Sequence, residues 1–195
     1  MRQACIDASW WARAVTRISL AVNISVAQLC HERIAETIRT VLYETGLAPD
    51  QLVLEITETA LLVGAERAMA NVNAFRSLGV HVALDDFGTG YSSLAYLKAV
   101  PADIVKIDRS FVEGVADSPV DRDIVAAIID LSYALGRTVI AEGIETDAQY
   151  VALRQLGCPL AQGFLWSAAV PAEDVLALAP AGFAAPAALN GAGPH

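Results

Sequence analysis

Residues 80–94 read VHVALDDFGTGYSSL, in which two adjacent carboxylates, Asp85 and Asp86, follow a mainly apolar run. Successive residues of a strand face opposite ways, so a strand that continued through this pair would turn one of them into the core. A buried charge without a partner costs much free energy. We therefore expect the strand to end between the two residues, with Asp85 on the rim of a sheet and Asp86 at the start of a glycine loop.

Similar apolar runs lie on both sides of this stretch, and together they predict six strands. The runs are ISLAVNISV (18–26), LVLEIT (52–57), VHVALDD (80–86), ADIVKID (102–108), TVIAEGIE (138–145) and the weaker LAQGFLW (160–166). Helical patterns lie between them, for example at 64–79, 118–136 and 146–157, and each of these three ends at a glycine that can cap a helix. Strands that alternate with helices predict an α/β fold of parallel strands, buried on both faces.

Polar side chains appear where these predicted strands end. They are spaced about 28 residues apart on average, close to one strand-helix-strand step, and are Asn23, Glu55, Asp85, Lys106, Glu142 and Gln162. Any one of them is also compatible with an ordinary strand end that meets water. Parallel strands present the same end on the same side, so the six together indicate a site on one rim, as in (β/α)8 barrels.

Composition limits the classes of protein that fit. The chain is 55% hydrophobic, yet polar residues interrupt every apolar run before the roughly 18 residues of a membrane helix. The start, MRQACIDASWWARAV, does not resemble a secretory signal, which predicts a cytoplasmic location. A formal net charge of -9 disfavours nucleic acid polymers, so a phosphate ligand would need metal ions. The three cysteines are expected to be reduced, buried thiols.

The number of strand-helix units is too small for a complete barrel. An eight-stranded barrel takes about 250 residues, whereas six units are recognisable in these 195 residues. We expect a TIM-like barrel domain at 1–179 that is incomplete at its N-terminal end. Residues 180–195, rich in Ala, Gly and Pro, are expected to form a disordered tail.

Six segments resemble the EAL domain family, the bacterial cyclic di-GMP phosphodiesterases. They occur in the family's order and are AVNIS (21–25), LEITET (54–59), LDDFGTGYSSLAYLK (84–98), VKIDRSFV (105–112), IAEGIET (140–146) and GCPLAQGFLWS (157–167). The resemblance implies a (β/α)8 barrel of EAL type. It also implies a second-messenger signalling reaction, the metal-dependent hydrolysis of cyclic di-GMP to linear pGpG.

Two departures from the family pattern bear on activity. The Glu-Ala-Leu segment that names the family does not occur in these residues, and its Glu is a metal ligand in the family. We therefore expect this chain to have weak or no activity. Alternatively, the missing part of the barrel comes from a misplaced start or from a partner chain that completes the barrel. After Gln162, Ser167-Ala168-Ala169 replaces the common Ser-Arg-Pro, a departure that bears on a ligand contact.

The resemblance also implies residue roles. Asn23, Glu55 and Asp85 would bind a first metal ion, and Asp86 would bind a second. Carboxylate and carboxamide oxygens suit Mg²⁺ or Mn²⁺, and two such ions about 3.5 to 4 Å apart can activate water and neutralise phosphate oxygens.

Other family positions surround those ligands. Lys106 would contact the phosphate or the attacking water, and Glu142 would be the general base. Glu145 is expected near the metals and Gln162 towards the ligand. Glu58 and Asp108 are expected to support the metal ligands, with ordinary strand-end caps as an equal alternative.

A competing function remains open at this point. The chain is alternatively a non-catalytic module that binds cyclic di-GMP or a protein partner, or an inert product. The family often forms dimers through the segment near Tyr91–Lys98, so a homodimer is a further expectation.

Overall fold

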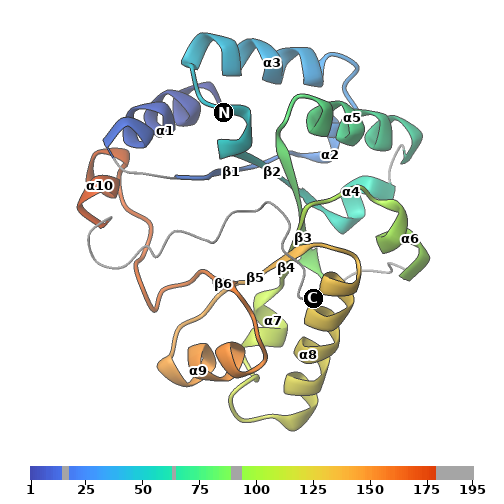
Figure 1. Ribbon diagram of the computed structural model, residues 1–195, viewed down its shortest axis with the longest axis vertical. Helices are drawn as coiled ribbons and strands as arrows, with labels where there is room; N and C mark the ends of the chain where they lie inside the picture. The colour runs from blue at the N-terminus through green and yellow to red at the C-terminus, as the bar shows by residue number, and fades with distance from the viewer. Residues whose placement is uncertain (15–17, 63–64, 89–93, 179–195) are drawn as a thin grey trace. The chain divides into compact units, whose positions relative to one another are not determined.

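The computed structural model describes residues 1–14, 18–62, 65–88 and 94–178 (Figure 1). The elements follow in the order α1 (Arg2–Ala14), β1 (Leu20–Asn23), α2 (Val26–Leu29), α3 (Ile34–Thr45), η1 (Pro49–Gln51), β2 (Leu52–Thr57), α4 (Glu58–Leu62), α5 (Ala65–Ser77), β3 (His81–Phe87), α6 (Leu94–Ala99), β4 (Ile104–Ile107), α7 (Arg109–Val112), α8 (Pro119–Ala134), β5 (Thr138–Ala141), α9 (Asp147–Gln155), β6 (Leu160–Ala161), η2 (Ala172–Asp174) and α10 (Val175–Leu178). The predicted tail at 180–195 lies outside the described residues.

The six strands form one sheet whose order is that of the sequence, β1 to β6. β1 pairs with β2, β4 with β5 and β5 with β6, in each case in parallel. A helix follows each of the first five strands, which is the alternation that the sequence predicted. The prediction of an α/β fold with six strands is therefore confirmed.

The chain divides into two compact units. The first comprises Met1–Ala83, Val100–Ala102 and, among the described residues, 170–178. The second comprises Leu84–Ala99 and Asp103–Ala169. β3 contributes its first residues to the first unit and its last residues, which carry the aspartate pair, to the second.

The core of the first unit is built around β2. Five of its six residues are buried, and Leu52, Leu54 and Ile56 are inaccessible to solvent. β1 differs, because its residues alternate between half-buried and exposed. The expectation that every strand is buried on both faces is thus wrong for β1, and also for β6, whose two residues are half-buried. Both strands end the sheet order, so each has one strand neighbour and less cover.

The core of the second unit lies between the strands and α8 and α9. Its members are buried aliphatic side chains from β4, α8, β5 and α9, among them Val105, Ile107, Val125, Ile129, Val139 and Leu153. Burial of each large aliphatic side chain contributes about 1.5–3 kcal/mol, so this packing fixes the strand ends that carry polar groups.

Three glycines end helices as the sequence predicted. Gly79, Gly136 and Gly157 have φ values of 83°, 69° and 78°, in the left-handed region. Glycine adopts this region without the steric cost that a Cβ would add.

The three cysteines are free thiols, of which Cys5 and Cys158 are buried and Cys30 is half-buried. Burial raises the pKa of the Cys158 thiol to about 11. Within the described part of the chain, no helix combines the length and the apolar character needed to cross a membrane.

Candidate functional site

The aspartate pair lies near the end of β3. β3 continues to Phe87, so the expectation that the strand ends after Asp85 is wrong. Asp86 lies within the strand with a φ of 55°, which makes it the one non-glycine residue with positive φ among the described residues. Such a conformation costs about 1–3 kcal/mol and recurs at functional sites. It lets consecutive side chains escape the alternation of a regular strand.

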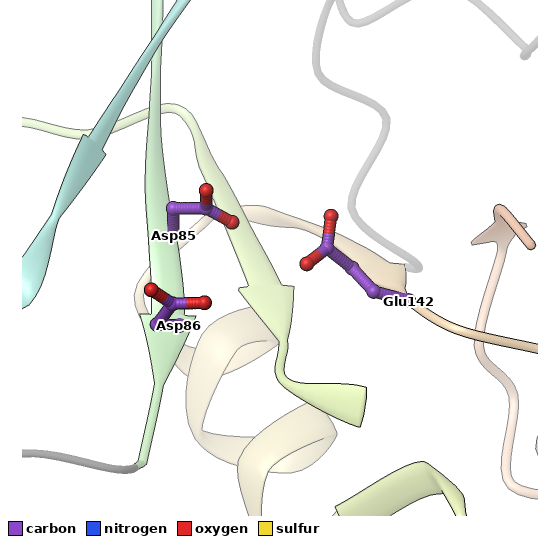
Figure 2. Close-up of side chains that lie close together, drawn as sticks. All are labelled: Asp85, Asp86 and Glu142. Atoms are coloured by element: carbon purple, nitrogen blue, oxygen red, sulfur yellow. The ribbon is translucent and has the colours of Figure 1, made fainter. Parts of the chain in front are cut away.

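Three carboxylates come together at this point. One oxygen from each of Asp85, Asp86 and Glu142 lies within 4.8 Å of the other two. Figure 2 shows Asp85 and Asp86 extending from β3 towards Glu142, which follows β5. Residues 56 and 57 positions apart in sequence therefore meet at one end of the strands, as the strand-end pattern predicted.

Lys106 on β4 lies between the two sides of this cluster. Its Nζ is 3.0 Å from Asp85 Oδ1 and 2.5 Å from Glu142 Oε1, and its side chain is only 4% exposed. A buried ammonium between two carboxylates offsets part of their repulsion.

Gln162 completes the surroundings of Glu142. In the register of β5 and β6, Ile140 pairs with Leu160 and Ala141 with Ala161, so the residues that follow lie level with each other. Gln162 Nε2 donates to Glu142 Oε1 at 2.5 Å. The same oxygen, Oε1 of Glu142, therefore pairs with the Lys106 ammonium and accepts the hydrogen bond from Gln162. These two contacts fix the orientation of the Glu142 carboxylate.

The electrostatics of the cluster show most clearly at Asp86. Burial raises the pKa of the Asp86 carboxyl above its ordinary value, and the neighbouring carboxylates Asp85 and Asp108 raise it further. Lys106 acts in the opposite direction. A carboxylate crowded by like charges is stabilised by an added cation, as expected of a metal ligand.

Two further predicted residues, Asp108 and Glu145, make contacts outside the cluster. Asp108 caps α7, because its Oδ1 accepts hydrogen bonds from the Ser110 N–H at 2.9 Å and the Ser110 hydroxyl at 2.5 Å. Glu145 pairs with Arg109, with 2.9 Å between Oε1 and Nη2. The cap alternative for Asp108 is thus observed, and its electrostatic effect on Asp86 shows that it also lies near the cluster.

The remaining predicted residues belong to the first unit and are described there. Asn23 and Glu55 are register partners on β1 and β2, so they are neighbours on adjacent strands. Glu55 is buried, and Glu58, which begins α4, is also buried. Their assignment as metal ligands and supporting group stays a prediction.

Sequence reasoning missed two residues that hold the turn after Glu142. Gln149 is buried, and its Oε1 accepts from the N–H groups of Glu145 at 2.8 Å and Thr146 at 3.0 Å. The Thr146-x-x-Gln149 pattern of a capping box could have identified it. Arg109 carried no such signal, because its role depends on a fold contact with the turn.

The donor set of the cluster fits a divalent cation. Three carboxylates whose oxygens converge, two of them half-buried, supply hard ligands of the kind that Mg²⁺, Mn²⁺ and Ca²⁺ prefer. Histidine and cysteine are absent from this cluster of described residues, which makes it unlike zinc centres.

Comparison with known proteins places these features in context. The family model of the EAL domain matches residues 1–169. The bifunctional diguanylate cyclase/cyclic di-GMP phosphodiesterase MucR of Pseudomonas aeruginosa is 42% identical over 159 residues, which are 82% of this chain and 23% of MucR. The chain thus spans roughly a fifth of the length of the first curated relatives that it matches.

Solved structures agree with the fold. The EAL domain of Mycobacterium smegmatis DcpA superposes with a TM-score of 0.87 at 40% identity, over 93% of this chain and 82% of that one. A complex of Klebsiella pneumoniae BlrP1 with manganese and cyclic di-GMP superposes with a TM-score of 0.79 at 32% identity, over 86% of this chain and 42% of that one. A further BlrP1 complex contains calcium with the same nucleotide.

Proposed function

The chain belongs to the EAL domain family, and from that premise we propose that its domain is a cyclic di-GMP phosphodiesterase that uses Mg²⁺ or Mn²⁺. The observation that carries the proposal is the convergence of Asp85, Asp86 and Glu142 around the buried Lys106. BlrP1, a structural relative, forms complexes that contain cyclic di-GMP with manganese or calcium. The product would be the linear dinucleotide pGpG.

Each residue of the cluster has a task in this reaction. Asp85 and Asp86 would hold metal ions, and the family resemblance assigns ligand roles to Asn23 and Glu55 as well. Bound divalent ions would acidify water and neutralise the phosphate oxygens. Glu142 would take a proton from the attacking water as its oxygen bonds to phosphorus. The ester bond to the ribose oxygen breaks in the same step, and that oxygen keeps the electron pair and takes a proton from solvent.

Lys106 and Gln162 would prepare Glu142 for that step. Both donate to Oε1 of Glu142, at 2.5 Å each, so they hold the carboxylate in one orientation. Lys106 also carries a positive charge that can face the phosphate. Its contact with Asp85 links the general base to the metal ligands.

Two assays on the purified chain test the proposal. Hydrolysis of cyclic di-GMP in Mn²⁺ is followed by separation of pGpG, and binding is measured by calorimetry. We expect slow turnover, because the Glu-Ala-Leu segment with its metal-ligand Glu does not occur in these residues. That turnover should fall by a further factor of about 10² or more in Glu142→Gln, since a general base contributes about 10²–10⁴. Asp130→Asn, which changes an exposed carboxylate on α8, is the control and should leave turnover unchanged.

The outcomes separate the alternatives. Binding without turnover would favour a non-catalytic module that recognises cyclic di-GMP. If the chain neither bound nor hydrolysed cyclic di-GMP, the proposal would be overturned for this chain. Turnover that survives Glu142→Gln would leave the family's activity in place but refute the role given to Glu142.

A further inference from the structure

The short helix α7 directly follows the strand that carries Lys106. It spans Arg109–Val112, and its first turn is capped by Asp108. Val112 is buried in the core of the second unit. The helix is therefore fixed at both ends, by a cap on one side and by apolar packing on the other.

One face of α7 contacts the aspartate segment. Gly88 has a φ of 100°, and a Cβ added there would come within 2.8 Å of Phe111 Cε2. The Phe111 ring therefore lies directly against the backbone two residues after Asp86, which is itself in the left-handed region. A strained conformation persists only where its surroundings impose it, and Phe111 supplies such a surrounding.

Another side chain of α7 contacts the turn that follows Glu142. Gly143 has a φ of 71°, and a Cβ there would come within 2.6 Å of Arg109 Cγ and 2.8 Å of its Cβ. The stem of Arg109 thus lies across Gly143, and its guanidinium reaches Glu145 Oε1 at 2.9 Å. This ion pair is half-exposed and adds little stability by itself, so its importance is geometric.

We propose that α7 positions both sides of the acidic cluster: Phe111 holds the Asp85–Gly88 segment and Arg109 holds the Glu142–Glu145 turn. Both are positioning residues, since they act through the backbone that carries the carboxylates. A metal centre needs its ligands held to within about 0.5 Å, and contacts from outside the ligand set provide this. The importance of this positioning for catalysis rests on the proposed function. The contacts of Phe111 and Arg109 do not depend on it.

Two glycine variants test the Arg109 contact. Gly143→Ala and Gly136→Ala impose the same backbone cost, because their φ values are 71° and 69°. The Cβ would meet Arg109 in the first case and nothing within 4 Å in the second. We expect Gly143→Ala alone to speed hydrogen exchange of the 142–146 amides and to weaken Mn²⁺ binding about tenfold or more.

Variants of Arg109 test the same contact from its other side. Arg109→Ala should reproduce both effects, and Arg109→Lys should restore part of the Mn²⁺ affinity, since it keeps the stem over Gly143 and a positive charge near Glu145. Unfolding midpoints are recorded for every variant. A purely structural role would lower the midpoint without a selective loss of Mn²⁺ affinity, and that result would overturn the proposal.

Phe111 has its own matched control. Phe111 and Tyr150 are both partly buried and pack against the same core, but Phe111 contacts Gly88 whereas Tyr150 pairs edge-on with Trp166. Phe111→Ala should speed exchange at 84–88 and weaken Mn²⁺ binding about tenfold or more, and Phe111→Tyr should not. Tyr150→Ala should lower the unfolding midpoint with Mn²⁺ affinity unchanged.

The exchange measurements are made without metal, which keeps the two proposals separate. If the wild-type chain bound neither Mn²⁺ nor cyclic di-GMP, the proposed function would fail and hydrogen exchange alone would decide the role of α7. If exchange at 84–88 and 142–146 stayed at wild-type rates in Phe111→Ala and Arg109→Ala, the positioning role would be refuted even in an active enzyme.

Discussion

Lys106 is a buried cation held between two carboxylates, and its removal should destabilise the second unit. Lys106→Met keeps a similar apolar stem but leaves Asp85 and Glu142 facing each other without the ammonium between them. Breaking a buried ion pair in this way costs about 3 kcal/mol or more. We expect a correspondingly lower free energy of unfolding in chelator, measured by urea denaturation.

Mn²⁺ should partly reverse this loss, because a divalent cation supplies the positive charge that the variant lacks. Lys98→Met is the control, since Lys98 on α6 is exposed and its change should alter the free energy of unfolding by less than about 0.5 kcal/mol. Equal losses in the two variants would contradict the importance given to the buried pairs.

The buried thiol of Cys158 should make the folded chain less stable at high pH. Burial raises the pKa of its thiol from 9.0 to about 11. Below pH 9 both folded and unfolded chains hold the proton; between about 9 and 11 the unfolded chain loses it first. Stability should therefore fall as pH rises through this window.

Unfolding curves at pH 8 to 11 for wild type and Cys158→Ala test this effect. The pKa of the Tyr133 hydroxyl is raised by burial and also by Cys158, so the difference between the two chains includes the loss of that second contribution. The variant should show a smaller decrease across the window. Parallel decreases would show that the thiol ionises equally easily in the two states.

The aspartate pair shows how far sequence alone can go at single residues. Two carboxylates after an apolar run predicted that both leave the core at a strand end, and they do meet Glu142. The left-handed φ of Asp86 was not predictable, because aspartate adopts this region more often than most residues but still only in a small minority of its positions. Arg109 was missed for a related reason: its partner, Gly143, becomes adjacent only when β4 and β5 pair.

At the scale of elements, the N-terminus of α9 depends on one buried amide. Gln149 accepts two turn N–H groups and donates Nε2 to Glu113 O at 3.3 Å. Gln149→Ala should cost about 1–2 kcal/mol, because it leaves turn N–H groups without their partner. Chemical denaturation gives the loss directly.

Gln28 provides the comparison, since it forms the same capping box on α2 with Ser25 but is exposed. Gln28→Ala should cost at most a few tenths of a kcal/mol, because water replaces the lost contact. If Gln28→Ala were as harmful as Gln149→Ala, burial would not be the cause.

The element order was largely predictable and the short elements were not. Apolar runs between helical patterns gave all six strands, and glycine stops gave the ends of α5, α8 and α9. α7 has four residues, too few for a helical period to appear, so the helix that contacts both sides of the cluster was invisible to pattern analysis. Exposure of β1 was likewise hidden, because it depends on sheet order rather than on composition.

At the scale of the whole molecule, the formal net charge of -9 opposes an anionic ligand. Cyclic di-GMP carries two phosphates, and the acidic cluster would repel them unless cations intervened. We expect calorimetric binding of cyclic di-GMP to be weaker in chelator than in Mn²⁺ or Ca²⁺. Equal affinity in both conditions would show that the nucleotide binds away from the carboxylates.

The family assignment was also within reach of the sequence, because six segments in a fixed order are a specific pattern, and the match to residues 1–169 confirms it. The predicted domain limits at 1–179 and the ligand role of Asn23 and Glu55 stay predictions. Both the domain limits and this ligand role depend on contacts between segments that are far apart in the sequence, and local sequence patterns do not determine such contacts. The segment proposed for dimers begins at Tyr91, outside the described residues.

The three thiols give the chain built-in chemical reporters. Cys5 is buried in the first unit and Cys158 in the second, whereas Cys30 is half-buried. An alkylating reagent applied in a short pulse should modify Cys30 first. The rate of modification of Cys5 would then report how often the first unit opens, and that of Cys158 how often the second unit opens. Mass spectrometry would measure both rates in a single unlabelled sample.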